Sequence, residues 1–501
     1  MVQNLNFKLL LFPLMFKDGF FISVIICIKK SKIIKIKKIG QYKIAESEFR
    51  TAVNQNNSHL LGELKKEYLP LLTILDLPDY NKKNVIDFIR HAFPEIYAEL
   101  PKKMDSIEII PLFGKVILPG MIDTHVHFRT PGQEHKEDFT SASKAALKGG
   151  VTTAFDMPNN KPAIIDKITL KQKKKLAQSS LGINYGFYLG VTDTNIDKIF
   201  PIKNVAGYKI YLGSSTGDLL VTNWQEVLPK LLQSDKPVVI HAEDELVIRE
   251  NLKKVDGPAV INHGKVRDRN ATLQAMKNIQ NIFEQANNGI KSNVIIAHIS
   301  TAEEIDFINE WKQMGYPVFA ELTLHHLFLN EEDFIKNPNF LKINPPLRTE
   351  KDNSYLLKSI QNNGIDCIGS DHAPHTKIEK ESDDPPSGVP GMEYNLLLLF
   401  DLFISGTLSM DPLLKVTSEN ALRIFSINNK GKISENNDAD LVILDPWTKT
   451  SIIDDAVISK AGFTPFNGRT VQGSILLTMV NGRIGYFEKQ FYKTEGKDLF
   501  N

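Results

Sequence analysis

The feature that most constrains the fold is a regular alternation of short apolar runs and amphipathic helical segments between Ile107 and Ile427. Strands separated by such helices pair in parallel, because the helix carries the chain back to the starting edge of the sheet. Eight runs are predicted as strands: Val116–Ile122, Val151–Met157, Asn184–Leu189, Gly207–Tyr211, Val238–His241, Asn293–His298, Pro317–Leu322 and Asp366–Ser370. Eight parallel strands close a (β/α)8 barrel, so we predict this TIM-type α/β fold.

The ends of individual helices agree with this pattern. One predicted helix begins near Asp138 and stops at Gly149-Gly150, and another has Ser300 as its N-cap with Glu303 three residues later. An open doubly wound sheet is the alternative architecture. Such a sheet would not bring polar groups from the ends of at least six strands to one point, whereas a closed barrel does so at its rim.

The regions on either side of the barrel follow other patterns. Residues 1–40 and 431–501 contain short strand-like runs, and we expect them to pair in one small β-sandwich domain, because a sheet built from the tail alone would have open edges. Residues 41–105 show helical spacing without a chemical motif and are predicted to be a helical insert. The barrel is then assigned to residues 106–430.

The apolar stretch Leu9–Ile28 raises the question of a membrane or signal segment. Lys17 and Asp18 interrupt it, which leaves no continuous apolar span of about 20 residues, and no small-residue cleavage site follows. The alternation in Phe20–Ile36 favours strands with one solvated face. We therefore expect neither a signal peptide nor a membrane anchor.

Composition narrows the partners and the compartment. The 60 basic and 59 acidic residues nearly cancel, so nothing predicts a nucleic-acid or anionic-membrane partner. Small neutral or anionic substrates remain open. Only Cys27 and Cys367 are present, too few for a disulfide framework, and this usage is typical of a reducing cytoplasm. A metal site would therefore use His and carboxylate ligands.

The strongest chemical signal is the motif Asp123-Thr-His125-Val-His127-Phe-Arg129 after the first predicted barrel strand. Residues two apart on a strand face the same side, so His125 and His127 can bind one metal ion together. A lone His-x-His pair would usually be structural. Other polar residues end later strands: His241, His298 and Asp371. Imidazole and carboxylate ligands in this number favour a zinc site.

Lys209 is the unusual member of this set, because an ammonium group would be repelled by a dicationic metal site. A salt bridge is the structural explanation. Alternatively, a buried lysine loses its proton easily, and the neutral amine can take up carbon dioxide to form a carbamate that bridges two metal ions. Two zinc ions would activate a shared water and polarise a carbonyl, with Asp371 as the proton shuttle to the departing amide nitrogen.

The motifs together resemble the dihydroorotases of the amidohydrolase superfamily, over roughly residues 107–487. The resemblance rests on Leu118-Pro-Gly-Met-Ile-Asp-Thr-His-Val-His-Phe-Arg-Thr-Pro-Gly132, Met157-Pro-Asn159, Tyr208-Lys-Ile-Tyr-Leu-Gly-Ser-Ser-Thr-Gly217, His241-Ala-Glu-Asp244, Ala297-His-Ile-Ser300, Ile343-Asn-Pro-Pro-Leu-Arg348 and Ser370-Asp-His-Ala-Pro-His-Thr376. It implies reversible, zinc-dependent hydrolysis of (S)-dihydroorotate to N-carbamoyl-L-aspartate in de novo pyrimidine biosynthesis. A cytoplasmic enzyme is expected, and a homo-oligomer is left open.

The resemblance also assigns roles to residues. The metal ligands would be divided between two zinc ions: His125, His127 and Asp371 for one, His241 and His298 for the other, and N6-carboxylated Lys209 as the bridge. Asp371 would also be the catalytic general acid and base. The substrate carboxylate would be held by Arg129, Asn159 and His375.

Physical chemistry supports the implied carboxylate site. A guanidinium meets a carboxylate with two parallel charged hydrogen bonds, and Arg129 continues the strand parity of His127. Taken alone, a surface salt bridge for Arg129 and a turn position for Asn159 are plausible. The small polar segment Gly213-Ser-Ser-Thr-Gly217 suits either a mobile loop over bound substrate or an ordinary βα turn.

Two features depart from the family pattern. Asn160 stands where the family commonly has Thr, and residues 41–105 interrupt the region where the first sandwich strands should lead into the barrel. The competing functions are an allantoinase or hydantoinase, whose members generally lack an arginine at the position of Arg129, and a catalytically inactive scaffold. A scaffold would be expected to have lost ligands, and none is missing here.

Overall fold

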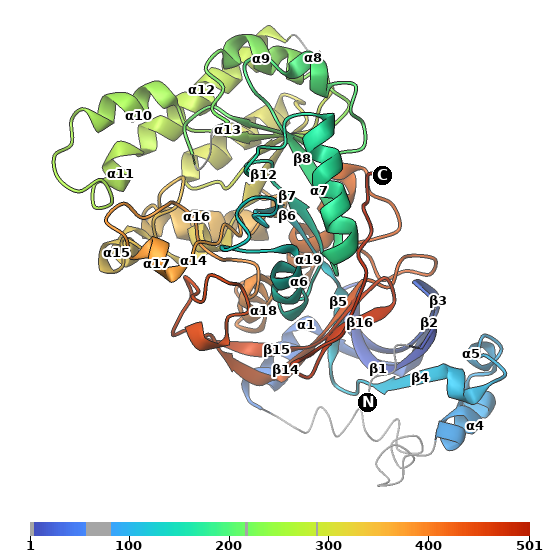
Figure 1. The fold of residues 1–501 in the computed structure, drawn as a ribbon. Coiled ribbons are helices and arrows are strands. Elements are labelled where there is room, and N and C mark those ends of the chain that lie inside the picture. Colours follow the sequence, from blue (N-terminus) through green and yellow to red (C-terminus); the bar gives the residue numbers. More distant parts are fainter. Residues whose placement is uncertain (1–4, 57–81, 216–218, 287–288) are drawn as a thin grey trace.

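The computed structural model describes residues 5–56, 82–215, 219–286 and 289–501. Its centre is a barrel of eight parallel strands that follow one another in sequence order (Figure 1). They are β6 (Met121–Val126), β7 (Val151–Asp156), β8 (Asn184–Gly190), β9 (Gly207–Tyr211), β10 (Val238–His241), β11 (Val294–Ile296), β12 (Val318–Leu322) and β13 (Cys367–Ile368). A parallel bridge between Val126 and His372 closes the ring. The predicted (β/α)8 architecture is therefore confirmed.

The first predicted barrel strand is divided in two, which corrects the expected run Val116–Ile122. β5 (Val116–Pro119) pairs with strands outside the barrel, and β6 begins only after Gly120. Proline removes a hydrogen-bond donor from the strand. A side chain at Gly120 would overlap Thr152, whose atoms lie 2.2 Å from the position of an added Cβ. The chain therefore leaves the outer sheet and enters the barrel at Pro119-Gly120.

Helices connect the strands and cover the outside of the barrel (Figure 1). The longer ones are α6 (Phe139–Lys148), α7 (Lys167–Ser180), α9 (Trp224–Leu231), α10 (Glu245–Leu252), α12 (Arg269–Gln285), α13 (Ala302–Gln313), α16 (Glu350–Gln361) and α18 (Asn395–Ile404). The shorter ones are α8 (Ile196–Ile199), α11 (His263–Val266), α14 (Leu324–Phe328), α15 (Glu331–Lys336), α17 (Lys377–Lys380), α19 (Met410–Leu414), the π-helix η2 (Lys415–Glu419) and α20 (Asn420–Phe425).

The helix ends test the predicted capping residues. Asp138 caps α6 and Gly149 is its C-cap, as predicted. For α13 the prediction is one residue early, because the N-cap is Thr301 and the capping box is completed by Glu304. The amide of Ser300 also donates to the Glu304 carboxylate, at 2.9 Å, so Ser300 lies in the turn before the helix.

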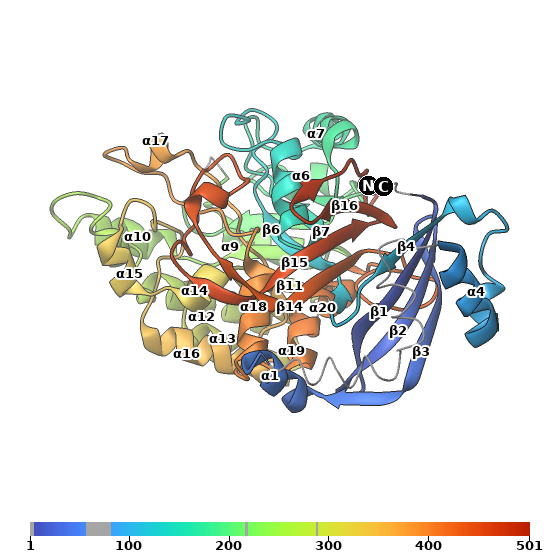
Figure 2. The same ribbon diagram turned by 90° about the horizontal axis from the view of Figure 1, so that it is seen from below.

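The two chain ends form one curled sheet of nine strands together with the segment before the barrel (Figure 2). Its order is β17–β16–β15–β14–β5–β1–β2–β3, with β4 beside β1. The strands are β1 (Phe7–Lys17), β2 (Phe20–Lys29), β3 (Lys32–Ala45), β4 (Ile107–Pro111), β14 (Leu441–Ser451), β15 (Thr470–Val480), β16 (Arg483–Phe487) and β17 (Gln490–Phe491). β5 joins β1 to β14, so the expected pairing of the two chain ends is confirmed.

The curled sheet encloses an apolar core of its own. Leu10, Ile26, Leu441 and Leu477 are fully buried in this cluster, which is separate from the large cluster around the barrel. Side chains on the opposite face of the sheet, such as that of Ile25, belong to the large cluster. The sheet therefore gains hydrophobic stabilisation from both of its faces.

The predicted helical insert contains helices, but its first residues continue β3 as far as Ala45. Residues 57–81 lie outside the described part. α1 (Glu46–Asn54) packs against α18, and the Nδ2 of Asn54 donates to the carbonyl of Ile404 at 3.0 Å. α4 (Lys82–Ala92) and α5 (Pro94–Tyr97) lie at the outer side of the N-terminal strands (Figure 2). The proposed division of the chain into domains stays a prediction.

The apolar stretch at residues 9–28 forms most of β1 and β2. Within the described ranges, no helix is both long and apolar enough to cross a membrane. Cys27 and Cys367 are buried free thiols, as expected. Burial raises the pKa of Cys27 to about 12, so this thiol stays protonated and unreactive at neutral pH.

Candidate metal centre and substrate pocket

A pocket lies at the carboxyl-terminal ends of the barrel strands, the rim at which (β/α)8 enzymes place their active sites. Its walls contain eight of the nine site residues predicted from the sequence, and the ninth, His375, is fully buried beside them. The lining residues are His125, His127, Arg129, Asn159, Lys209, Tyr211, Ser215, His241, His298, Asn344, Asp371, Ala373, Ser387 and Gly388. The barrel therefore brings residues from six strand ends to one point, while their roles stay a prediction.

His125, His127 and Asp371 form one candidate metal site, because their ligand atoms lie within 4.8 Å of one another. The Oδ1 of Asp371 is 2.9 Å from the Nε2 of His127 and 3.5 Å from the Nε2 of His125. The two histidines come from the end of β6 and the residue after it, and they share a face as the strand parity predicts. Asp371 follows β13.

Lys209, His241 and His298 form a second group. The Nδ1 of His241 lies 2.9 Å from the Nε2 of His298. Burial lowers the pKa of both imidazoles, so both rings are neutral and have a lone pair for a metal. Within the described chain, the Nζ of Lys209 has no hydrogen bond and no ion pair, and burial lowers its pKa to about 8. The salt-bridge explanation for Lys209 is therefore excluded.

The spacing of these donor atoms fits zinc. Zinc–nitrogen bonds are about 2.0–2.1 Å long, so two ligand atoms on a tetrahedral zinc ion are roughly 3.3 Å apart. The donor-atom separations of 2.9, 2.9 and 3.5 Å lie around this value. Neutral imidazoles with one carboxylate are also the ligand chemistry that zinc prefers. The residues present therefore fit a zinc-type metal centre.

Glu321 orients His125. The Nδ1–H of His125 donates to the Oε1 of Glu321 at 2.6 Å, and Thr124 donates to the other carboxylate oxygen at 2.7 Å. Burial opposes ionisation of Glu321, but the facing His125 and Thr124 outweigh it and lower the pKa of the carboxyl group. Gly369 leaves the necessary room, since an added Cβ would lie 2.6 Å from the Cδ of Glu321. The Nε2 lone pair of His125 thus faces the pocket.

His127 and His241 are held in a similar way. The Nδ1–H of His127 donates to the Oδ1 of Asn159 at 2.7 Å, and the Nε2 of His241 lies 3.0 Å from the Oε2 of Glu243. Burial opposes ionisation of Glu243, but its ion pair with Arg267 and the contact with His241 lower its pKa to about 2. These partners fix the ring nitrogen that is left for a metal.

Three pocket residues have a left-handed backbone although none is glycine: Arg129 at φ 62°, His298 at φ 43° and Asp371 at φ 43°. Such conformations cost on the order of 1–3 kcal/mol each and persist where the surroundings enforce them, often at active sites. Burial opposes ionisation of Asp371, but the facing imidazoles outweigh it and hold the pKa well below its usual value. Asp371 is therefore ionised at neutral pH.

Arg129 is buried at the wall of the pocket, with 2% of its surface exposed. Its Nε donates to the carbonyl of Pro374 at 3.1 Å, and its NH2 nitrogen lies 3.1 Å from the Nε2 of His375. Burial lowers its pKa to about 10, so it remains charged at neutral pH. It has no carboxylate ion pair within the described ranges, which excludes a surface salt bridge as its role.

Comparison with known proteins agrees with this geometry. Residues 116–485 match the family model described as "Amidohydrolase family".

The chain belongs to the amidohydrolase family.

Two curated relatives of this amidohydrolase are named dihydroorotase. One, from Methanosphaera stadtmanae, is 33% identical over 408 residues, which cover 80% of this chain and 92% of the relative. The other, from Pyrococcus abyssi, is 37% identical over 374 residues, which cover 74% of this chain and 83% of the relative. The predicted resemblance to the dihydroorotases is therefore confirmed.

Solved structures share the fold of this amidohydrolase at lower sequence identity. L-hydantoinase (dihydropyrimidinase) from Arthrobacter aurescens aligns with a TM-score of 0.80 and 21% identity, covering 98% of both chains. D-hydantoinase (dihydropyrimidinase) from Thermus sp. aligns with a TM-score of 0.76 and 20% identity, covering 99% of this chain and all of that chain. These alignments confirm the barrel with its attached β domain.

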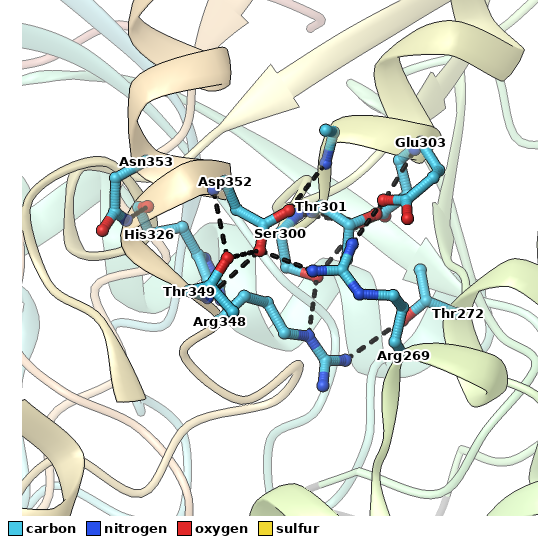
Figure 3. A network of polar contacts seen from close by, with 12 residues as sticks. Arg269, Thr272, Ser300, Thr301, Glu303, His326, Arg348, Thr349, Asp352 and Asn353 are labelled. Atoms are coloured by element: carbon cyan, nitrogen blue, oxygen red, sulfur yellow. Dashed lines mark hydrogen bonds and ion pairs between the residues drawn. The ribbon is translucent and has the colours of Figure 1, made fainter. Parts of the chain in front are cut away.

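A polar network supports the turn after β11 in this amidohydrolase (Figure 3). The Nε of Arg348, which ends the motif Ile343–Arg348, lies 3.5 Å from the Oγ of Ser300, and its NH2 lies 3.3 Å from the Oγ1 of Thr272. Arg269 at the start of α12 donates to Asp352 in α16 at 2.6 Å. The network ties the starts of α12, α13 and α16 together, because Asp352 accepts hydrogen bonds from both Arg269 and the amide of Ala302.

Several residues of the site were not predicted. Glu243 and Asn344 stand inside motifs that had been recognised but not assigned a role, and Tyr211 is two residues beyond the candidate bridging lysine. For Glu321, the only sequence feature that could have predicted a role in the site is its position near the end of β12. Lys136, which contacts the fully buried histidine of the predicted carboxylate site, has no sequence signal.

Two further predictions concern segments beside the pocket. Ser215, in the predicted loop Gly213–Gly217, lines the pocket, whereas Thr216 and Gly217 lie outside the described residues. Asn160, the departure from the family pattern, accepts a hydrogen bond from the buried Nζ of Lys173 at 2.8 Å. Asn160 therefore has a structural partner outside the candidate metal site.

Proposed function

We propose that this protein is a dihydroorotase, which reversibly hydrolyses (S)-dihydroorotate to N-carbamoyl-L-aspartate in de novo pyrimidine biosynthesis. The observation that carries the proposal is Arg129, a buried guanidinium in the pocket wall without a carboxylate partner among the described residues. A buried charge is costly unless it is paired, so this pocket suits a substrate with an anionic group. The relatives named dihydroorotase support the same substrate.

The proposed cofactor is a pair of zinc ions. The ligands would be His125, His127 and Asp371 for one ion, His241 and His298 for the other, and N6-carboxylated Lys209 as the bridge. Carboxylation of Lys209 is supported by its pKa of about 8, since the neutral amine is the form that takes up carbon dioxide. It is also supported by the absence of any hydrogen bond to Nζ within the described chain.

The proposed reaction is hydrolysis of a ring amide. When bound, the zinc pair supplies an activated water and polarises the carbonyl carbon under attack. Asp371, which is ionised, accepts a proton from the attacking water and donates it to the ring nitrogen as the carbon–nitrogen bond breaks. The water oxygen ends in the new carboxylate and the departing nitrogen ends in the carbamoyl group. Ring closure follows the same steps in reverse.

Selection of the substrate is assigned to Arg129, Asn159 and His375. The guanidinium of Arg129 would bind the substrate carboxylate through charged hydrogen bonds. Burial and the nearby cations lower the pKa of His375, so this ring is neutral and can donate one hydrogen bond. A ring without a carboxylate would leave the guanidinium unpaired, and a site built for a charged partner rejects such a ring strongly.

The rival function is an allantoinase or hydantoinase, and the fold is shared with proteins named hydantoinase. Arg129 favours a ring that bears a carboxylate, which those names do not imply. The other rival is an inactive scaffold, which would be expected to lack ligands. The pocket lining contains all six candidate ligands, and this favours an enzyme.

The cysteines and the charge balance bear on the cellular setting of the proposed enzyme. Two buried free thiols without a disulfide are compatible with the cytoplasm. A small-molecule substrate needs no nucleic-acid partner, in keeping with the nearly balanced charge of the chain. A homo-oligomer would be detected by the molar mass of the purified protein in solution.

The test is a substrate panel on purified protein with metal content measured in the same sample. Dihydroorotate should be hydrolysed, and allantoin and hydantoin should not, at a zinc content near two per chain. Turnover of only the rings that lack a carboxylate would overturn the dihydroorotase assignment. Protein that remains inactive after zinc and bicarbonate have been added would favour the scaffold.

A further inference from the structure

Lys136 makes an unusual contact behind the pocket wall. Its Nζ lies 3.0 Å from the Nδ1 of His375 and 2.9 Å from the Oε1 of Glu379. Lys136 is buried, with 9% of its surface exposed, and His375 is fully buried. The other ring nitrogen of His375, Nε2, lies 3.1 Å from the NH2 of Arg129 and 3.1 Å from the carbonyl oxygen of Ser387.

The distribution of protons follows from these partners. Glu379 is ionised, because Lys136 and the Thr376 amide outweigh its burial and lower its pKa to about 2. An ammonium group only donates hydrogen bonds, so Lys136 donates to Glu379 and to the Nδ1 of His375. A neutral imidazole carries a single proton. That proton must therefore lie on Nε2, and it is donated to the carbonyl oxygen of Ser387.

The position of this proton determines which hydrogen-bond donors remain available at the pocket wall. Arg129 has only donors and cannot donate to a ring nitrogen that is itself protonated. Its NH2 nitrogen is thus kept from a hydrogen bond with His375. Ser387 and Gly388 line the pocket, and an added Cβ at Gly388 would lie 3.2 Å from the Cδ2 of His375. The Nε2 edge of the ring therefore lies next to the pocket wall, beside Arg129.

We propose that Lys136 is a positioning residue that fixes His375 as the Nε2–H tautomer, which keeps the NH2 donor of Arg129 available for a carboxylate on the substrate. This inference rests on the proposed function and adds a residue to its specificity. Without Lys136, the Nδ1 of His375 would take the proton and turn it toward the Oε2 of Glu379, 3.8 Å away. Nε2 would then accept from Arg129 and occupy one of the donors meant for the substrate.

The first test removes the donor. Lys136→Met should raise the KM for dihydroorotate roughly tenfold while kcat changes less than about threefold, because the lost interaction is one to a non-reacting group of the substrate. Lys136→Arg, which keeps a cationic donor, should restore most of the affinity. The matched control is Lys161→Met, which removes an exposed lysine charge near Lys136 and should leave KM unchanged.

The second test asks whether Lys136 acts through His375. In a double-mutant cycle, Lys136→Met should have little further effect on KM when it is added to His375→Gln. Nitrogen chemical shifts of histidine-labelled protein give a readout that activity does not affect. The signals of His375 are those that are missing from the spectrum of His375→Gln. This ring should be protonated on Nε2 in the wild type and on Nδ1 in Lys136→Met.

The outcomes are distinguishable. Independent effects of the two substitutions on KM, or an Nδ1–H tautomer of His375 in the wild type, would overturn the role of Lys136. If Lys136→Met shows no thermal unfolding transition, the variant is not folded. The role of Lys136 is then tested by the tautomer of His375 in the wild type and by the KM of Lys136→Arg. Absence of dihydroorotate turnover in the wild type would defeat the proposed function instead, while the nitrogen shifts would still report on the tautomer.

Discussion

The barrel mouth and the curled sheet differ in the ion pairing of their buried cations Arg129, Lys209 and Lys430. In the sheet, the buried ammonium of Lys430 lies 3.0 Å from a carboxylate oxygen of Asp438 and also donates to Asp440. At the mouth, Arg129 and Lys209 are equally buried, and neither has a carboxylate partner in the described part of the chain. The ion pairs of Lys430 stabilise the folded chain beside the sheet, whereas Arg129 and Lys209 are left for groups that must come from outside the chain.

Backbone conformation shows the same contrast. Left-handed residues other than glycine occur in the sheet at hairpin turns, where Asp18, Lys30 and Asn481 reverse the chain. At the mouth, His298 and Asp371 have this conformation directly after barrel strands and line the pocket. The molecule thus uses the strained conformation to turn the chain in one region and to aim functional side chains in the other.

The largest expected effect is the loss of kcat caused by a substitution at the barrel mouth. Asp371→Asn removes the proposed proton acceptor and one candidate ligand, so kcat should fall by about 10³- to 10⁴-fold, at the upper end of general acid–base effects. The melting temperature of the metal-free protein should stay within a few degrees. The matched control is Asp366→Asn, just before the same strand, where the carboxylate pairs with Lys312 at 2.5 Å. That variant should lose stability and keep most of its kcat; equal losses of kcat would contradict the contrast.

The next effect compares two buried lysines directly. Lys430→Met leaves the buried carboxylate of Asp440 without its cation, while Asp438 keeps its ion pair with Lys32, so the free energy of unfolding should drop by about 3–5 kcal/mol. Lys209→Met removes an unpaired amine, so the same quantity should stay constant or rise, while activity is lost. Denaturant unfolding of both metal-free variants measures the difference. A larger loss of stability in Lys209→Met than in Lys430→Met would show that Lys209 is a structural residue.

The smallest effect depends on pH. The folded-state pKa of Glu379 is about 2, below its ordinary value of 4.5, because Lys136 and the Thr376 amide favour the carboxylate more than burial opposes it. Its contribution to stability is therefore present above about pH 4.5 and is lost as the pH falls toward 2. Wild type should melt above Glu379→Gln at pH 7, and the gap should close between pH 4.5 and 2. A difference in melting temperature that does not change with pH would contradict this role of Glu379. The same pH-dependent difference for the exposed control Glu381→Gln would also contradict it.

The sequence was sufficient to predict the barrel because its strands are apolar runs of the right length, separated by helices with readable ends. The polar residues at the strand ends could be grouped because a barrel brings those ends together. The division of the first strand at Gly120 was missed, since it depends on a close approach to Thr152. Glu321 and Lys136 were missed because each acts on a histidine far away in the sequence, and such contacts are visible only after folding.

The central claim is that a buried, unpaired guanidinium selects a ring that carries a carboxylate, and Arg129→Gln tests it most directly. The kcat/KM for dihydroorotate and the zinc content should be measured together in this variant and in the wild type. We predict that kcat/KM falls at least about 100-fold, as expected when one partner of a buried charge pair is truncated, while zinc content is unchanged. Wild-type turnover of dihydroorotate by Arg129→Gln with its zinc retained would contradict the account.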